Sequence, residues 1–221
     1  MPLGAPHDVL SWAIVGGGRR VASDVVWREV VRGELGPEVD PVALPAALLR
    51  RALAEVKLPD AVGLLTARDV RSFDTAEAID AGDPALHARC VATVGLANAL
   101  AAGDPPGAAH PGTINLCVQV STSLGEEALL EALALAAEAR TAAMLEARLP
   151  SPLSGRPASG TGTDCIVVAA PVAPDGSRSV ARLAYAGKHT RVGSLLGAAV
   201  RDAVARGIAR WLEEARCAKQ P

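Results

Sequence analysis

The most constraining feature of the sequence is a helical pattern that begins after Thr190 and continues to about Leu212. Thr190 is a suitable N-cap residue for such a helix. A helix of some 24 residues is about 36 Å long, and one side of it must be covered by other apolar elements. Its apolar residues recur at i, i+3, i+4 and i+7, which places them on one face: Val192, Leu195, Leu196, Ala199, Val200, Ala203, Val204, Ile208, Trp211 and Leu212.

The segment before this helix contains two apolar β runs separated by a turn. The first run, residues 165–170, follows the loop Gly160-Thr-Gly-Thr-Asp164, and the second ends in Tyr185-Ala-Gly-Lys-His-Thr190. Between them lies Pro174-Asp175-Gly176, which is a typical hairpin turn. If the runs pair about this turn, residues 185–188 lie at the same end of the hairpin as Asp164. His189 would then begin the helix beside Asp164.

The predicted proximity of Asp164 and His189 is a candidate for chemistry. A carboxylate can orient an imidazole and stabilise its protonated form, and histidine, with a reference pKa of about 6.5, is a suitable general base. The positive end of the helix dipole would favour a developing oxyanion there. In the structural alternative, Asp164 only caps a turn and His189 only begins a helix, and the pattern leaves both readings open.

The rest of the chain predicts short strands and two further helices. The strands are expected at residues 9–15, 21–31, 61–66, 72–79, 88–96 and 112–120, and the helices at 41–56 and 123–147. There is no regular alternation of strand and helix. We therefore predict one α+β domain over residues 1–221, with a largely antiparallel sheet covered on one or both faces by long amphipathic helices.

Local signals give five finer expectations. Ser123-Leu-Gly-Glu126 matches a capping box at the start of the second long helix. Period-two alternation places Asn115 on the non-core face of its strand, and His110 lies in a solvated loop. The segment 150–157, rich in proline and serine, is expected to form a connection that can act as a mobile flap. Glu138 follows alanines on a helix, where the sequence alone favours the surface.

Composition argues against several classes of function. The net charge of -2 does not fit a nucleic-acid-binding protein, and aromatic residues make up 2% of the chain, too few for base-stacking platforms. The four cysteines show no CxxC spacing, which favours a reduced, cytoplasmic protein. A signal peptide is not expected, nor is an apolar stretch of the roughly 20 residues that cross a membrane. A homo-oligomer is compatible with the sequence.

Six short blocks occur in order between Val9 and Leu212: Gly63-Leu-Leu-Thr-Ala67, Thr93-Val-Gly-Leu-Ala-Asn98, Gly112-Thr-Ile-Asn-Leu116, Glu138-Ala-Arg-Thr-Ala-Ala143, Gly160-Thr-Gly-Thr-Asp-Cys165 and Tyr185-Ala-Gly-Lys-His-Thr190. Together they resemble the adenosylcobinamide amidohydrolase family. The chain departs from the family pattern at Val15-Gly-Gly-Gly18, where an asparagine is expected before the glycines.

The resemblance implies hydrolysis of the amide that joins the aminopropanol arm to the corrin ring of adenosylcobinamide, giving adenosylcobyric acid in corrinoid salvage. Cobalt would arrive within this corrinoid substrate, and no separate cofactor or metal is expected. The catalytic candidates are His189, Asp164 and Thr163, with water, Thr163 or Cys165 open as the nucleophile. The resemblance also favours Glu138 as a buried polar anchor. The candidates for substrate binding are Asn115, Gly160, Thr161, Gly162, Lys188, Thr190 and Glu138.

Three other functions remain open on the sequence. The protein could bind corrinoids without catalysis. It could bind a phosphate or nucleotide at its glycine-rich turns, although the triple glycine is better read as a tight turn because no helix with a Walker-type lysine follows it. Finally, His189 and Asp164 could ligate a metal in a hydrolase, although a lone pair lacks the three protein ligands usual at catalytic zinc.

Overall fold

The computed structural model describes the chain except for residues 32–33, 35–42, 107–111, 173–181 and 219–221. Its centre is a seven-stranded sheet in the order β3-β2-β1-β9-β7-β5-β4. Two neighbouring pairs, β2–β3 and β7–β9, are parallel and the others are antiparallel. A two-stranded sheet joins β6 (Ala99–Leu100) to β8 (Gly160–Thr161). The seven strands are β1 (Pro2–Ser11), β2 (Gly18–Glu29), β3 (Val62–Thr66), β4 (Phe73–Asp80), β5 (Asp83–Val94), β7 (Ile114–Val120) and β9 (Cys165–Pro171).

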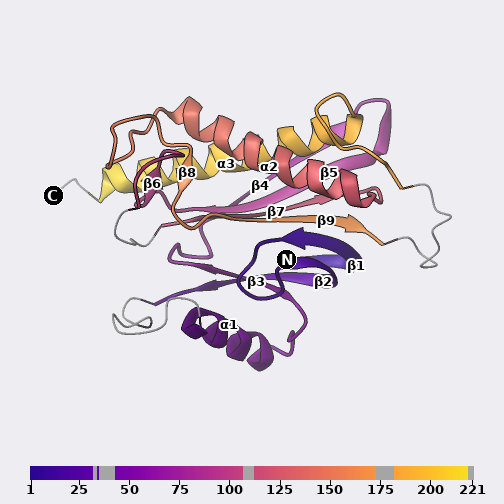
Figure 1. The fold of residues 1–221 in the computed structure, drawn as a ribbon, viewed down its shortest axis with the longest axis horizontal. Helices are drawn as coiled ribbons and strands as arrows, with labels where there is room; N and C mark the ends of the chain where they lie inside the picture. The colour runs from indigo at the N-terminus through magenta and orange to yellow at the C-terminus, as the bar shows by residue number, and fades with distance from the viewer. Residues whose placement is uncertain (32–33, 35–42, 107–111, 173–181, 219–221) are drawn as a thin grey trace.

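The elements form layers around this curled sheet (Figure 1). The long helices α2 (Glu126–Ala147) and α3 (Arg191–Cys217) cover one face, while α1 (Ala43–Glu55) lies on the far side against β2 and β3. The strands β1, β2 and β3 curl beneath β7 and β9, and a second apolar core fills the space inside the curl. The α+β single-domain prediction is therefore confirmed in its fold class.

The helical pattern at the C-terminal end of the chain is confirmed as α3. Its apolar face is buried against β4, β5 and α2, and Val192, Leu196 and Val200 are fully covered. Thr190 is the N-cap, and its hydroxyl accepts a hydrogen bond from the N–H of Gly193 at 3.0 Å. Among the described helices, none is both long and apolar enough to cross a membrane.

The predicted hairpin after β9 is wrong where the structure describes it. The turn at 174–176 lies outside the described residues. β9 is paired on one edge with β1 and on the other with β7, so neither edge is free for a returning strand. Residues 182–190 form no strand, and Leu183 makes only an isolated bridge with Leu124. The geometry that placed His189 beside Asp164 is therefore absent.

The expected capping box is also wrong. α2 begins at Glu126 with Gly125 as its N-cap, and no side chain caps it. The hydroxyl of Ser123 instead donates to the carbonyl of Pro171 at 2.7 Å and fastens the chain to the end of β9. A tertiary hydrogen bond has replaced the local one.

Asn115 points away from α2 and α3, as the alternation predicts, but this second face of β7 is not exposed. Asn115 is buried, and its Nδ2 donates to the carbonyl of Leu65 in β3 at 2.6 Å. The curl of the sheet covers both faces of β7, and this could not be read from the period. His110, in the expected loop, lies outside the described residues, and the short strand β6 (Ala99–Leu100) lies before it in the sequence.

Candidate functional site

The carboxylate of Asp164, directly before β9, is held by four donors. Its Oδ1 accepts from the N–H of Ile114 at 3.0 Å and from the hydroxyl of Thr161. Its Oδ2 accepts from the N–H of Thr161 at 3.0 Å and from Nη1 of Arg140. A carboxylate has about four lone-pair sites, so the side chain of Asp164 has no acceptor capacity left for an imidazole.

Asp164 and Arg140 form a largely buried ion pair. Their side chains are 7% and 14% exposed, respectively. The loop next to them packs so closely that its glycines have no room for a side chain. A Cβ atom on Gly160 would collide with Arg140, and one on Gly162 would come within 2.5 Å of Nδ2 of Asn98. The glycine-rich loop is therefore shaped by the ion pair and by Asn98, which also accepts the Gly162 N–H at its backbone carbonyl.

Polar contacts continue from this loop into the curled sheet. The hydroxyl of Thr113 lies 2.7 Å from the carbonyl of Thr163 and 3.2 Å from Oδ1 of Asn115. Asn115 in turn donates a hydrogen bond to the carbonyl of Leu65. Thr163 is exposed, and its hydroxyl donates to the carbonyl of Gly112 at 3.1 Å. The starts of β7 and β9 and the end of β3 thus share one hydrogen-bonded network.

Arg140 also faces an open hollow of about 390 Å³. Its Nε is buried and has no hydrogen-bond partner among the residues that the structure describes. The guanidinium therefore has donor capacity beyond its contact with Asp164. Arg140 was not among the candidates derived from the sequence, although it lies in the same block as Glu138. The other lining residues are Leu100, Ala101, Ala102, Thr141, Ser159, Gly160 and Thr161.

The connection predicted as a flap is tied down beside this hollow by Asp104. The carboxylate of Asp104 accepts from the hydroxyl of Ser151 at 2.5 Å, from the N–H of Ala101 at 2.8 Å and from Arg156 at 2.9 Å. These hydrogen bonds, that of Ser151 first, lower the pKa of Asp104 well below its usual value. The segment 150–157 is thereby linked to the strand-end residues that line the hollow.

Lys188, His189 and Thr190 lie in a different environment, at the start of α3. Lys188 forms an ion pair with Glu138, and both side chains are exposed. Glu138 is therefore a surface residue, as the sequence alone indicated, and the buried-anchor expectation is wrong. His189 is exposed, and its side chain makes no hydrogen bond or ion pair with any described residue.

The structure thus separates the two residues that the hairpin was expected to join. Asp164 lies where β9 begins, whereas the chain returns to the sheet beside Leu124, at the end where β9 finishes. A shared metal site for His189 and Asp164 loses its geometric basis. The catalytic role predicted for His189 stays a prediction, but Asp164 does not orient its imidazole.

Cys165 follows Asp164 and points into the second core. Its side chain is buried, and its Sγ lies 3.8 Å from the hydroxyl of Ser11. Burial raises the pKa of the Cys165 thiol to about 11. The thiol is therefore protonated at neutral pH, which makes it a poor nucleophile.

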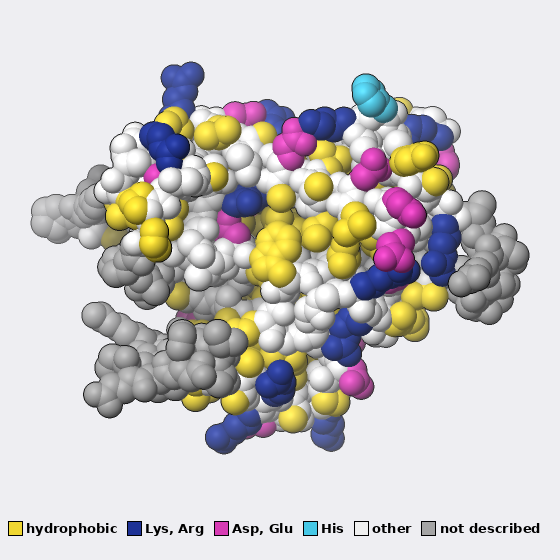
Figure 2. Space-filling view, viewed as in Figure 1, with side chains coloured by type: hydrophobic (Ala, Val, Ile, Leu, Met, Phe, Trp, Pro, Cys, Tyr) yellow, Lys and Arg dark blue, Asp and Glu magenta, His cyan; other side chains and the backbone are white. Residues whose placement is uncertain are grey.

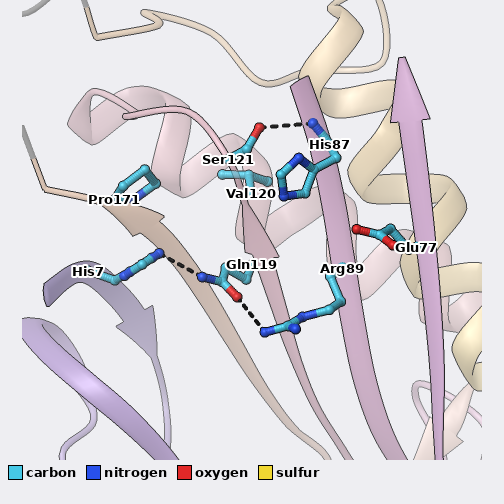
Figure 3. Close-up of a pocket in the computed structure, with 8 residues that line it drawn as sticks. All are labelled: His7, Glu77, His87, Arg89, Gln119, Val120, Ser121 and Pro171. Atoms are coloured by element: carbon cyan, nitrogen blue, oxygen red, sulfur yellow. Dashed lines mark hydrogen bonds between the residues drawn. The ribbon is translucent and has the colours of Figure 1, made fainter. Parts of the chain in front are cut away.

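A second hollow of about 330 Å³ lies at the opposite end of β7 (Figure 3). Gln119 donates to Nε2 of His7 at 2.9 Å and accepts from Arg89 at 3.0 Å, while Nδ1 of His7 donates to the carbonyl of Ala5 at 2.8 Å. Both ring nitrogens of His7 are thus used within the protein. The other residues around this hollow are Glu77, His87, Val120, Ser121 and Pro171, and it contains none of the site residues predicted from the sequence.

Comparison with known proteins gives one family. Residues 1–216 match the model of the family described as adenosylcobinamide amidohydrolase. A protein of Halobacterium salinarum (strain ATCC 700922 / JCM 11081 / NRC-1), named adenosylcobinamide amidohydrolase, is 36% identical over 137 residues, which are 56% of this chain and 53% of that protein. The match therefore spans about half the length of this curated relative. Among solved structures, the PH0078 protein from Pyrococcus horikoshii OT3 has a TM-score of 0.38 and 14% identity over 67% of this chain and 43% of that one.

Proposed function

Since the chain belongs to the adenosylcobinamide amidohydrolase family, we propose that it hydrolyses an amide bond of adenosylcobinamide. The bond is the one between the carbonyl carbon of the corrin side chain and the nitrogen of the aminopropanol arm. Water supplies the hydroxyl group of the new carboxylic acid and the proton of the released amine. The products are adenosylcobyric acid and aminopropanol, which makes the reaction a step of corrinoid salvage.

The observation that supports this proposal is the meeting of five family blocks at one network. Asp164 is hydrogen-bonded to Ile114 and to Arg140, which come from two other blocks. Asn98, in a fourth block, accepts from Gly162 of the Asp164 block, and Leu65, in a fifth, accepts from Asn115 of the Ile114 block. The network borders the hollow at Arg140, Gly160 and Thr161. Positions that are far apart in the sequence are thus combined where polar groups face solvent.

Within this site, we assign the carbonyl oxygen of the scissile amide to Arg140. Amide hydrolysis needs donors for the oxyanion that forms when water attacks, and donors fixed in advance act most strongly. The guanidinium is always charged, is held by Asp164, and belongs to a residue that lines the hollow. Asp164 therefore positions Arg140. Thr163 is the candidate that orients the attacking water. Its exposed hydroxyl donates its hydrogen to the carbonyl of Gly112, so that its oxygen can accept a hydrogen bond from the water.

The test is incubation of the protein with adenosylcobinamide without ATP, followed by mass analysis for adenosylcobyric acid and aminopropanol. We expect both products, and we expect them also after treatment with a chelator, because the proposal needs no nucleotide and no separate metal. An absolute requirement for ATP would overturn the proposal. Binding of the corrinoid without release of aminopropanol would instead indicate a non-catalytic corrinoid-binding protein.

The role of Arg140 has its own test in the same assay. Arg140→Lys keeps the positive charge but loses the planar set of donors, and we expect kcat to fall about 100-fold, the usual scale for an oxyanion donor. Arg201→Lys is the matched control, because Arg201 forms an exposed ion pair with Glu146 on the same helical layer. Equal kcat values for the two variants would remove Arg140 from the chemical step.

A further inference from the structure

A band of apolar side chains lies between β1 and α2 and ends at the candidate site. One side of it comes from the end of β1 and the residue that follows, where Leu10 and Trp12 alternate with buried residues. The other side comes from α2, where Leu130, Leu133 and Ala137 recur at i, i+3 and i+7 on one helical face. Figure 2 shows hydrophobic side chains gathered at the centre of this face of the molecule, with charged side chains on either side of them. We call these five residues the Trp12 band.

Contacts at both ends hold the two sides of the band together. At one end, Arg19 bridges Asp8 of β1 and Glu126 at the start of α2, at 2.7 and 2.8 Å. At the other end, Arg140 of α2 pairs with Asp164. In the middle, Leu10 packs against the same core as Leu133 and Ala137. These contacts place the end of β1 beside α2, with the proposed oxyanion donor at one end of the band.

Trp12 has a fixed position on this surface. Its Nε1 donates to the backbone carbonyl of Asp164 at 2.7 Å, while its side chain remains largely open to solvent, with 48% of the residue exposed. Leu130 is 57% exposed. The chain contains only three Trp, one Tyr and one Phe. One of these few aromatic side chains is thus anchored in the open beside the site, where burial by a ligand would be favourable.

The size of the hollow indicates what the band contacts. A volume of about 390 Å³ is at the low end of the range for drug-sized ligands. A corrin macrocycle with its substituents and adenosyl group is larger than such ligands. Only an arm of the substrate therefore fits beside Arg140, and the macrocycle must lie on the surface next to it.

From these observations we propose that the Trp12 band is the docking surface for the apolar part of the corrin macrocycle. The proposal rests on the proposed function for its ligand. Docking there would direct one amide arm past Trp12 towards Arg140 and leave the rest of the corrin in solvent. Specificity for a corrinoid would then come from the band, and cleavage of the bond would come from the Arg140–Asp164 network.

The experiment measures binding of adenosylcobyric acid, the product that keeps the macrocycle and is not turned over, by equilibrium dialysis detected by the visible absorbance of the corrin. KM and kcat with adenosylcobinamide are measured on the same preparations. We expect Trp12→Ala to raise Kd about tenfold, in keeping with the loss of a large buried apolar side chain. Trp12→Phe keeps an aromatic ring but loses the hydrogen bond to Asp164, and we expect a smaller rise. Leu130→Ser, remote from that hydrogen bond, should raise Kd and KM several-fold with kcat within about twofold. Circular dichroism establishes that each variant is folded.

Ile79→Ser is the matched control, since Ile79 is 55% exposed on β4, away from the band. Its Kd should equal that of the unchanged protein. If Kd and KM are unchanged in both Trp12→Ala and Leu130→Ser, the band is not the docking surface, even if the enzyme is active. Weakened binding in a protein that releases no product would support the docking surface and refute the proposed hydrolysis. A dimer that Leu130→Ser dissociates in light scattering, with unchanged corrinoid binding, would show that the band is a subunit interface and overturn the proposal.

Discussion

The loop at Asp164 and the segment at His189 have similar sequences but very different surroundings. Both combine glycine, threonine and a titratable side chain, and both precede a regular element. Yet Asp164 accepts hydrogen bonds from three residues on three different segments. His189 is exposed and contacts no described residue through a hydrogen bond or ion pair.

The polar groups around Asp164 are fixed by hydrogen bonds, whereas the side chain of His189 is solvated. Catalysis by donors requires that they be held in place before the substrate arrives, because ordering them during the reaction costs free energy. The Asp164 network satisfies that condition, whereas the segment at His189 does not satisfy it in the free protein. Perturbing the fixed network should therefore have larger effects on turnover and stability than perturbing the exposed segment.

The largest effect is expected for Asp164→Asn. The amide cannot accept from all four donors at once, and the positive charge of Arg140 is left without its partner. Removing one member of a buried ion pair typically costs about 3 to 5 kcal/mol, and we expect a loss near the lower end because Arg140 is partly exposed. Turnover of the folded protein should fall at least about 100-fold, since Arg140 loses its position. Urea unfolding and turnover on the same preparation measure the two effects.

A matched control for this variant is Asp80→Asn, which breaks the ion pair between Asp80 and Arg191 at the start of α3. That pair has an exposed arginine, and exposed pairs contribute little to stability. We expect nearly unchanged turnover and only a small change in stability. If the two variants lose equal stability and activity, the Asp164 network is not special and the comparison fails.

An intermediate effect is expected for Asp104→Asn, which loosens segment 150–157 beside the hollow. Hydrogen bonds lower the pKa of Asp104, so its carboxylate stabilises the fold above the unfolded-state pKa of about 3.9, and this stabilisation is lost as the pH falls below that value. The melting temperature of the variant should therefore be lower at pH 7 and approach that of the unchanged protein below pH 4.

The carboxylates of Asp69 and Asp80, whose pKa values Arg71 and Arg191 lower to about 2, are present in both proteins, so their contribution cancels in this comparison. A constant difference in melting temperature across the whole pH range would show that the charge of Asp104 is not what holds the segment.

A smaller effect is expected for Cys165→Ala. The thiol is buried and its pKa is raised to about 11, so it packs as a small apolar group and we expect turnover within about twofold and a loss of about 1 kcal/mol. Thiol reagents should label exposed Cys217 first, as peptide mass analysis would reveal. An inactive but folded Cys165→Ala protein with a covalent adduct at Cys165 would identify a cysteine nucleophile instead.

The sequence predicted the elements whose signals are local. The period of 3.6 residues located α3 and its N-cap, and runs of apolar residues located five strands (β2, β3, β4, β5 and β7) near their observed bounds. The first strand was misplaced, since it spans Pro2–Ser11 and not residues 9–15. Non-local competition could not be read in the same way. The Pro-Asp-Gly sequence predicts a hairpin turn, but only the fold shows that β1, from the opposite end of the chain, already occupies an edge of β9.

Only part of the candidate site could be predicted from the sequence, again because local signals can be read in it and non-local contacts cannot. Gly160 and Asp164 could be found because glycines and a carboxylate interrupt an apolar sequence. Arg140 could not, since an arginine among alanines on a helix looks like a surface residue until the β8–β9 loop is placed against it. For Asn115, the period gave the correct face of the strand, but not the layer that covers it.

The smallest effect is expected for His189→Ala. Its side chain is exposed, and the apolar face of α3 begins at Val192, so the melting temperature should not change. If His189 is the acid–base group, turnover falls about 100-fold. We expect a change within about threefold, because nothing in the described structure fixes the imidazole near Arg140. In the double variant, the effects of His189→Ala and Asp164→Asn should be additive, because residues without shared contacts act independently. A strong loss in His189→Ala that is less than additive with Asp164→Asn would mean that the bound substrate brings the two regions together, and that the exposed segment becomes part of the site only in the complex.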